Sequence, residues 1–316
     1  MDINKSSNNK IKVMKKTFFV IVFFCTVAIY AQQEPQYTQY MYNTTIVNPA
    51  YAGSNGNIKL FGLYRAQWVG LEGAPTTANF SMHKPIEGTK MGFGVSVLND
   101  KIGPSDETQL AVDLSYTLFL NKDNRLAFGV KTSGNILNID YSKISEYNPG
   151  ENMVNNNISN RFSPNLGLGL FYYNDNSYLG LSIPMILDAK RYDDVVSSSV
   201  NQRYHLYLMG GKVFDLNYDL KFKPAFVVKS TDGTPLQLDL TANMLYNNKF
   251  SFGMSYRWNI AVSAMAGFQI NDNLFLGYGY DRETSRLTKI VSGSHELFLV
   301  FDIFRNKSRI DTPRYF

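Results

Sequence analysis

The chain has 316 residues, 31 basic and 26 acidic side chains, a formal net charge of +5 and a single cysteine, Cys25. Residues 1–31 hold five lysines, one aspartate and the cysteine, so 26 basic and 25 acidic residues and no thiol remain after them. This excludes a disulfide framework, a cysteine nucleophile, an iron–sulfur cluster and a cysteine-based zinc site from residues 32–316. It also leaves no concentrated basic surface for nucleic acid.

The N-terminal segment has the parts of a secretory signal. Two lysines precede an apolar stretch at Thr17–Ile29, and a small-residue cleavage edge follows at Ala31. The apolar stretch is shorter than the roughly 20 residues that a membrane-spanning helix needs. We therefore expect residues 1–31 to be the signal peptide of an exported bacterial protein, with Met14 as an alternative start. An uncleaved N-terminal anchor is the other interpretation.

Residues 32–56 show no regular pattern, but they are rich in tyrosine, which occurs at positions 37, 40, 42 and 51. Such a content of aromatic residues is unusual for a disordered segment. The domain that follows is predicted below to be a barrel. We expect these residues either to lie against the periplasmic mouth of that barrel or to enter it as a plug. A flexible extension is the alternative.

From residue 57 on, apolar and polar residues alternate in segments of roughly ten residues. Leu110 and Val112, for example, share one face of their segment, while Asp113 and Ser115 share the other. Asn, Asp, Gly and Lys clusters separate the segments. They lie near residues 57–69, 75–84, 90–99, 108–120, 125–138, 164–173, 177–185, 203–213, 218–229, 235–246, 250–259, 261–270, 273–281 and 294–304.

A soluble β-sandwich also alternates, so the face opposite the apolar one decides the fold class. That face carries many glycine, charged and amide residues: Gly92, Gly94, Lys131, Asn135, Gly167, Gly169, Arg257, Gly277 and Gly279. A transmembrane barrel combines an apolar outer band with a polar or small-residue interior. The sequence predicts an all-β fold, a transmembrane antiparallel β-barrel of about fourteen strands, with twelve to sixteen open, over residues 57–304. A C-terminal tail follows at 305–316.

The links between the segments alternate in length. Tight turns rich in asparagine are expected at 121–124, 174–176, 214–217, 247–249 and 271–273, and longer links at 99–107, 139–163, 186–202 and 282–293. Outer-membrane barrels have short periplasmic turns and longer outer loops, so both termini are expected in the periplasm. The short links 230–234 and 259–260 break this pattern and keep the strand number open. Pro224 inside a strand segment predicts a bulge.

Catalytic and metal-binding patterns are weak. The three histidines lie far apart in the sequence, and His295–Glu296 has only part of a zinc-helix motif. Ser81 and His83 share a face of one segment, and Ser294 lies on another, so an outer-membrane hydrolase is a third hypothesis behind the two given below. We expect no catalytic, cofactor-binding or metal-binding residue and no enzyme activity.

Several motifs carry a family resemblance. Pro35–Ser54 contains PQYTQYMYN and NPAYAGS, and Leu63–Thr77 reads LYRAQWVGLEGAPTT, with HKPI after it at His83. GFGVSVLNDKIGP from Gly92 and GSHE at Gly293–Glu296 continue the series. In these motifs the chain resembles the PorP/SprF family, outer-membrane proteins of the type IX secretion system in Bacteroidetes. The resemblance covers essentially the whole chain after residue 31.

The resemblance implies an outer-membrane component of protein export and, in some members, of gliding motility. It implies contact with outer-membrane lipid, with secreted cargo such as adhesins that bear a C-terminal sorting domain, and with periplasmic lipoproteins of the type IX system. The family offers no catalytic residues. The matching positions are candidate structural or partner-contact sites: Asn48, Pro49, Ala50, Tyr51, Gly53, Arg65, Trp68, Gly293, Ser294, His295 and Glu296.

Two functions follow as hypotheses. The first is a non-enzymatic outer-membrane barrel that supports export or surface anchoring of cargo, with partners docked on the barrel rim and on residues 32–56. The alternative is a passive porin or small-solute transporter, because a barrel of about fourteen strands is wide enough to hold a channel or a plug.

Overall fold

The structure is a computed structural model that describes residues 40–140, 142, 157–187, 204–231, 234–284, 288 and 291–303. The chain divides into two compact units, Met1–Glu34 and Pro35–Phe316, and every described residue belongs to the second. The predicted signal peptide and C-terminal tail lie outside the described residues. In the described ranges, no helix is long and apolar enough to cross a membrane.

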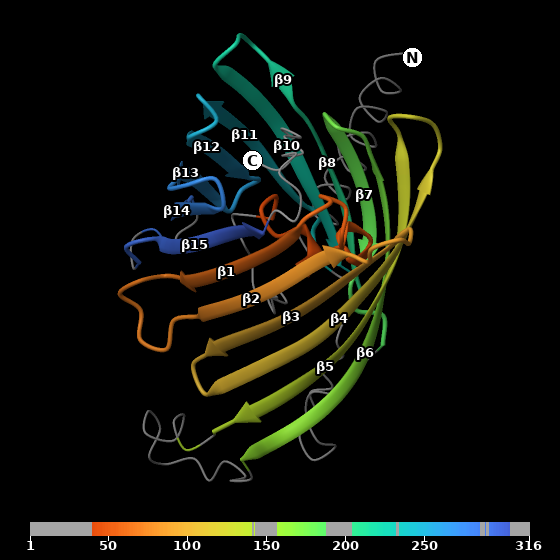
Figure 1. The fold of residues 1–316 in the computed structure, drawn as a ribbon. Coiled ribbons are helices and arrows are strands. Elements are labelled where there is room, and N and C mark those ends of the chain that lie inside the picture. The colour runs from red at the N-terminus through yellow and green to blue at the C-terminus, as the bar shows by residue number, and fades with distance from the viewer. Residues whose placement is uncertain are drawn as a thin grey trace, which may run out of the picture. The chain divides into compact units, whose positions relative to one another are not determined.

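The described residues after position 57 form one closed antiparallel β-barrel (Figure 1). Strands that follow one another in the chain lie side by side, and β1 (Ile58–Ala66) pairs with β15 (Ser294–Ile303), which closes the sheet. Between them lie β2 (Thr76–Pro85), β3 (Met91–Ile102), β4 (Ser105–Phe119), β5 (Arg125–Ile139), β6 (Ile158–Tyr173), β7 (Ser177–Ile183), β8 (His205–Lys212), β9 (Phe214–Asp215), β10 (Leu220–Thr231), β11 (Gln237–Tyr246), β12 (Phe250–Arg257), β13 (Ala261–Gln269) and β14 (Leu274–Glu283). The predicted all-β transmembrane barrel is confirmed.

These fifteen segments form a fourteen-stranded barrel, because β8 and β9 are two parts of one strand. Both pair with β10, and their registers, Gly211 with Ala225 and Phe214 with Phe222, belong to one continuous alignment. The pairing is interrupted at Lys212 and Val213, which lie opposite Pro224 and Lys223, and Pro224 has no N–H group to donate to the ladder. On its other side, Pro224 pairs in register with β11. The bulge predicted at this residue is therefore wrong, and a local gap in the ladder takes its place.

Side chains alternate between the lumen and the lipid-facing surface along each strand. On β4, Leu110, Val112 and Leu114 are 49%, 42% and 44% exposed, whereas Asp113 and Ser115 are almost fully buried. The exposed face is apolar and the buried face is polar. This is the reverse of a soluble domain, and it is the arrangement that a bilayer requires of a barrel.

The turns at one end of the barrel, which we call the turn end, share one asparagine-based conformation. The side-chain oxygens of Asn121, Asn174, Asn217 and Asn271 each accept hydrogen bonds from the backbone N–H groups two and three residues later. An asparagine side chain that replaces a backbone acceptor in this way stabilises a tight turn. The chain enters β1 and leaves β15 at the turn end. The longer links lie at the opposite end, the loop end.

Two links at the loop end are shorter than predicted. β3 and β4 run through the predicted link 99–107 and leave only Gly103 and Pro104 between them, and β6 takes up the second part of the link 139–163. The added part of the β3–β4 hairpin is polar, since Asn99 Nδ2 donates to Asp106 Oδ1 (2.7 Å) and Lys101 Nζ lies 3.1 Å from the same carboxylate. Apolar alternation stops where the strands leave the lipid-facing band, although the strand pairing continues.

Candidate functional site

Residues 40–56, which we call the plug, occupy the lumen of the barrel. They contain two short 3-10 turns, η1 (Thr44–Ile46) and η2 (Pro49–Tyr51), and Asn48 and Ala50 are 0% exposed. The plug contacts opposite sides of the wall, because it bonds to β4 as well as to β12. Of the two placements expected for residues 32–56, residues 40–56 have the one inside the barrel in this structure, and residues 32–39 lie outside the described part of the chain.

Wall side chains hold the backbone of the plug at several points between Thr45 and Gly53. Lys131 Nζ donates to Thr45 O (3.0 Å) and Ile46 O (3.2 Å), Ser182 Oγ to Val47 O (2.7 Å) and Ser115 Oγ to Ala52 O (2.7 Å), while Gly53 N–H donates to His83 Nδ1 (3.3 Å). Lys131 also pairs with Asp113 on β4, at 3.3 Å from Nζ to Oδ1. A buried ammonium group is stable only with such partners, so Lys131 ties the plug to the wall.

The plug forms no β-ladder with the barrel. Its backbone hydrogen bonds are local, for example Val47 N to Thr44 O and Ala52 N to Pro49 O. Among the described residues, no backbone–backbone hydrogen bond joins the plug to the wall. The segment is therefore a separate folded unit inside the sheet, and side chains attach it.

Polar side chains of the plug add specific contacts. Asn48 accepts a hydrogen bond from Ala50 N (3.0 Å), which caps η2, and its Nδ2 donates to Leu170 O on β6 (3.0 Å). The Tyr42 hydroxyl bonds to Ser251 Oγ on β12 (3.0 Å). Burial raises the pKa of Tyr42 to about 12, against a smaller lowering effect of the bond to Ser251, so the phenol is neutral at physiological pH.

Glycines in the wall let the plug backbone come close. A Cβ atom at Gly92 on β3 would overlap the carbonyl oxygen of Ala52, and one at Gly129 on β5 would overlap the backbone of Ala50. A Cβ at Gly169 on β6 would overlap the Asn48 side chain. These glycines are needed for space rather than for backbone conformation.

Aromatic rings fill the lumen on the side of β1, β14 and β15. Phe275 and Phe298 lie with their ring centroids 5.4 Å and 4.7 Å from that of Tyr42, and Phe61 lies 6.0 Å from Phe298. All four are buried and belong to one apolar cluster. The lumen therefore has a core of its own, built from plug and wall together.

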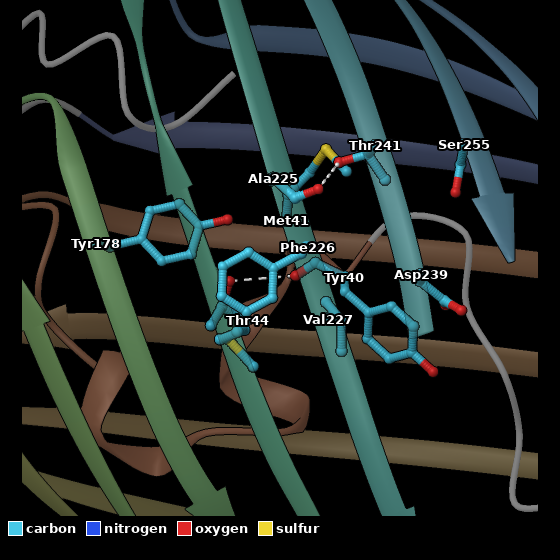
Figure 2. Close-up of a pocket in the computed structure, with 11 residues that line it drawn as sticks. Tyr40, Met41, Thr44, Tyr178, Ala225, Phe226, Val227, Asp239, Thr241 and Ser255 are labelled. Atoms are coloured by element: carbon cyan, nitrogen blue, oxygen red, sulfur yellow. Dashed lines mark hydrogen bonds between the residues drawn. The ribbon is translucent and has the colours of Figure 1, made fainter. Parts of the chain in front are cut away.

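A small pocket remains between the first plug residues and the wall (Figure 2). Tyr40, Met41 and Thr44 of the plug face side chains of β7, β8, β10, β11 and β12 across it. The two hydrogen bonds drawn there join Thr44 Oγ1 to Tyr40 O (3.1 Å) and Thr241 Oγ1 to Ala225 O (3.4 Å), so one lies within the plug and one within the wall. The pocket marks a region where plug and wall face one another less closely than at η2.

The seam between the first and last strands is joined by a buried ion cluster. Arg65 on β1 places Nη2 2.6 Å from Asp281 Oδ2 on β14 and Nη1 3.0 Å from Glu296 Oε2 on β15. All three side chains are at most 2% exposed. A second pair continues the network along the wall, since Arg257 Nε lies 3.1 Å from Asp239 Oδ2. Arg65 thus links the strand that opens the barrel to the two that close it.

The link after β1 is fastened to the start of β15. Trp68 has a left-handed backbone, with φ of 51°, and its N–H donates to Ser294 Oγ (3.2 Å). Its indole Nε1 donates to Glu283 Oε1 (3.0 Å). Gly293 has φ of 105° and its carbonyl accepts from Val69 N (2.9 Å). Five of the candidate residues, Arg65, Trp68, Gly293, Ser294 and Glu296, therefore meet at one place on the loop end.

His295 differs from its neighbours because it points to the outer surface. Its Nδ1 lies 2.6 Å from the Tyr278 hydroxyl, and the Tyr280 ring lies 5.2 Å from the imidazole ring. The remaining candidates, Asn48, Pro49, Ala50, Tyr51 and Gly53, lie in the plug. The sequence motifs thus fall into a plug group and a seam group, with His295 beside the second.

The serine and histidine side chains considered for a hydrolase have other hydrogen-bond partners in the described part of the chain. Ser81 Oγ donates to Asn43 Oδ1 (3.1 Å), Ser294 Oγ accepts from Trp68 N, and His83 Nδ1 accepts from Gly53 N. These are packing roles for the groups that a hydrolase would use. In the described part of the chain, no three His, Cys, Asp or Glu side chains gather as a metal site.

Comparison with known proteins decides the family. Residues 29–301 match the sequence profile of the type IX secretion system membrane protein PorP/SprF. The chain belongs to the PorP/SprF family. As a PorP/SprF protein with a transmembrane barrel, it is an outer-membrane component of type IX secretion. No curated protein matches the sequence.

Solved structures similar to this PorP/SprF chain are also barrels. Acinetobacter baumannii Omp33 has 9% identity and a TM-score of 0.46, covering 79% of this chain and 100% of its own. The Pseudomonas putida toluene transporter TodX has 12% identity and a TM-score of 0.48, covering 88% and 96%. A Pseudomonas aeruginosa FadL homologue has 12% identity and a TM-score of 0.48, covering 86% and 95%. Similarity at this level identifies no function.

Sequence reasoning on this family member missed the partners of its motif residues. Asp281 completes the Arg65 cluster from β14, and Ser115 and Ser182 bond the plug, yet none of the three stands in a recognisable motif. The only signal in the sequence was the alternation of apolar and polar residues along each segment. All three lie on the polar face of an alternating segment, which makes them lumenal, but alternation does not say which lumenal residues meet.

Proposed function

We propose that this PorP/SprF protein is a non-enzymatic, non-conducting docking component of the type IX system. It supports export or surface anchoring of cargo with a C-terminal sorting domain, such as an adhesin, and it is linked to gliding motility. Its periplasmic partners are lipoprotein components of the same system. The proposal rests on the family membership and on one structural observation, the plug that lies in the lumen.

The plug favours docking over passive transport. A porin needs a continuous polar passage, whereas here the plug and the aromatic cluster of Tyr42, Phe275 and Phe298 lie across the lumen. A protein that does not conduct acts through its surfaces. We place the turn end and both termini in the periplasm, because outer-membrane barrels carry their short turns there. The loop end then faces outward.

The candidate residues acquire roles in this scheme. Asn48, Pro49, Ala50, Tyr51 and Gly53 position the plug. The seam group shapes the outer rim: Arg65, Trp68, Gly293, Ser294 and Glu296 fix the link 67–75, and His295 lies at the lipid-facing edge of the same region. Val69 and Leu71 of this link are 38% and 41% exposed, and they offer apolar contact area beside the rim. We propose the rim as the surface that meets cargo.

Two measurements test the proposal. Purified protein in planar bilayers is expected to show no stable open channel, and affinity isolation from mild-detergent membranes is expected to recover sorted cargo and periplasmic lipoproteins. Replacing Val69 and Leu71 together by serine is expected to reduce cargo recovery without changing the folded fraction of the barrel. A large open conductance, together with isolation of the barrel alone and normal cargo export in a deletion strain, would establish the porin instead.

A further inference from the structure

We propose that the lumen of the barrel is a peptide-binding site, occupied by the plug as a ligand carried in the same chain, and that it binds the same segment supplied as a separate peptide. The ligand class is an irregular peptide with a compact pair of 3-10 turns and small residues where it crosses the wall glycines. This site is independent of the rim and of any cargo.

The first argument is how the segment is attached. Its backbone bonds are internal, and the described wall contributes side chains rather than a strand ladder. Removing the segment would therefore break no strand pairing of the barrel. A β-strand of the wall could not leave in this way, because its departure would expose two rows of backbone groups. The connection to β1 is the covalent tether, and Gly56, just before β1, is exposed.

The second argument is what the wall recognises. Lys131, Ser115 and Ser182 donate to backbone carbonyls of the plug, which are groups that every peptide carries. Recognition of this kind depends on the path of the peptide backbone. Selectivity for the peptide sequence comes from hydrogen bonds of plug side chains to the wall. Tyr42 bonds to Ser251, Asn43 to Asn79 and Ser81, and Asn48 to the carbonyl group of Leu170. Main-chain contacts for affinity and pockets for specific side chains are the usual division of work in peptide-binding proteins.

The third argument is the fit of small residues. The wall at Gly92 and Gly129 lies directly against the backbone of Ala52 and Ala50, and Gly53 lies against the backbone of Pro85 and Gly92. A larger side chain in the wall would occupy the space of the peptide. The wall glycines Gly92 and Gly129 thus lie where the backbone of the plug passes closest to the wall. This close fit belongs to a binding site rather than to a loosely filled pore.

The experiment uses the full chain with a protease site inserted between Gly56 and Asn57. After the protein is folded and cleaved in detergent, we expect the released segment to stay with the barrel during gel filtration. A labelled synthetic peptide of residues 40–56 is then expected to replace it, and unlabelled peptide in excess to compete. A peptide of scrambled sequence, and one with Ala50→Leu, are expected not to bind.

Wall variants make the test specific. In the cleavable chain, Ser115→Ala with Ser182→Ala removes two hydrogen bonds to the peptide backbone and is expected to weaken labelled-peptide binding about tenfold or more. Ser263→Ala is the matched control, because Ser263 is equally buried on the inner wall and no hydrogen bond to the plug involves it. It is expected to leave binding unchanged. Loss of the segment on cleavage from a barrel that stays folded would overturn the proposal, and so would failure of any labelled peptide to enter.

Discussion

The buried cluster at the barrel seam allows a sharp test of what closes the sheet. Arg65→Ala removes a cation that lies between Asp281 and Glu296, which are both buried on neighbouring strands. The two carboxylates then face one another without the guanidinium group. Because Arg65 is on β1 and its partners are on β14 and β15, the loss falls on the contact that joins the two ends of the sheet.

The magnitude follows from burial. Removing one member of a buried ion pair costs about 3–5 kcal/mol of unfolding free energy, because an uncompensated charge is left behind. Arg65 makes two such contacts, at 2.6 Å and 3.0 Å, so we expect the upper part of this range. The exposed pair Lys101–Asp106, with side chains 58% and 39% exposed, is the matched comparison. Lys101→Ala is expected to cost less than about 1 kcal/mol.

Urea unfolding of the barrel in detergent, followed by intrinsic fluorescence and by the heat-dependent gel shift of folded barrels, measures both variants. A triple variant, Arg65→Met with Asp281→Asn and Glu296→Gln, separates charge from packing. It leaves no uncompensated charge and is expected to regain at least half of the stability that Arg65→Ala loses. If Arg65→Ala costs no more than Lys101→Ala, or if the triple variant is less stable than Arg65→Ala, the reasoning is refuted.

Three further predictions concern the lumen and the rim. Gly129→Leu is expected to displace the plug at Ala50, which lowers thermal stability and produces channel openings in planar bilayers, whereas Gly62→Leu, on the lipid-facing side with no atom within 4 Å of its Cβ position, is expected to do neither. Ser294→Ala removes the acceptor for the N–H of Trp68 and is expected to cost about 1 kcal/mol in urea unfolding and to increase quenching of indole fluorescence by acrylamide. The folded-state pKa of Tyr42 lies near 12 against 10.0 in the unfolded chain, so its contribution to stability is complete below pH 10 and is lost as pH rises toward 12. Tyr42→Phe is therefore expected to show a shallower loss of stability over that pH window, and an equal slope in the two proteins would contradict this.

The barrel could be predicted from sequence because lipid on one side of the wall and a polar lumen on the other require apolar and polar residues to alternate along each strand. On β4, for example, Leu110 points to the lipid-facing surface and Asp113, three residues later, points into the lumen, and the same alternation repeats in the other strands. The alternation fails where lipid ends. Asn99 and Asp106 continue the β3–β4 hairpin through polar pairing, which no apolar pattern announces. The effect of Pro224 also depended on geometry, since only the pairing shows which neighbour loses its hydrogen bond.

The site was predictable in position but not in its contacts. The motif residues Asn48 and Arg65 were identified from the family resemblance. Arg65 was expected in a strand and lies in β1, whereas for the segment of Asn48 both the barrel mouth and the lumen were left open. Their partners, Leu170 and Asp281, were not identified, because the lumen joins residues that are distant in the sequence and a single sequence carries no periodicity for such contacts. The order in which strands face one another across a barrel appears only when the sheet is closed.

The distances along the chain between contacting lumenal residues have a kinetic consequence. The hydrogen bond from Tyr42 to Ser251 spans 209 positions in the sequence, and that from Arg65 to Glu296 spans 231. Residues near the start of the barrel unit therefore bond to residues near its end, which are synthesised last. Folding that depends on such non-local contacts is slow, because the entropy of closing long loops is lost before the contacts form. During that interval the aromatic residues of residues 40–56 have no lumen around them. A chain of this kind exposes apolar surface that is prone to aggregation until its last strand is paired.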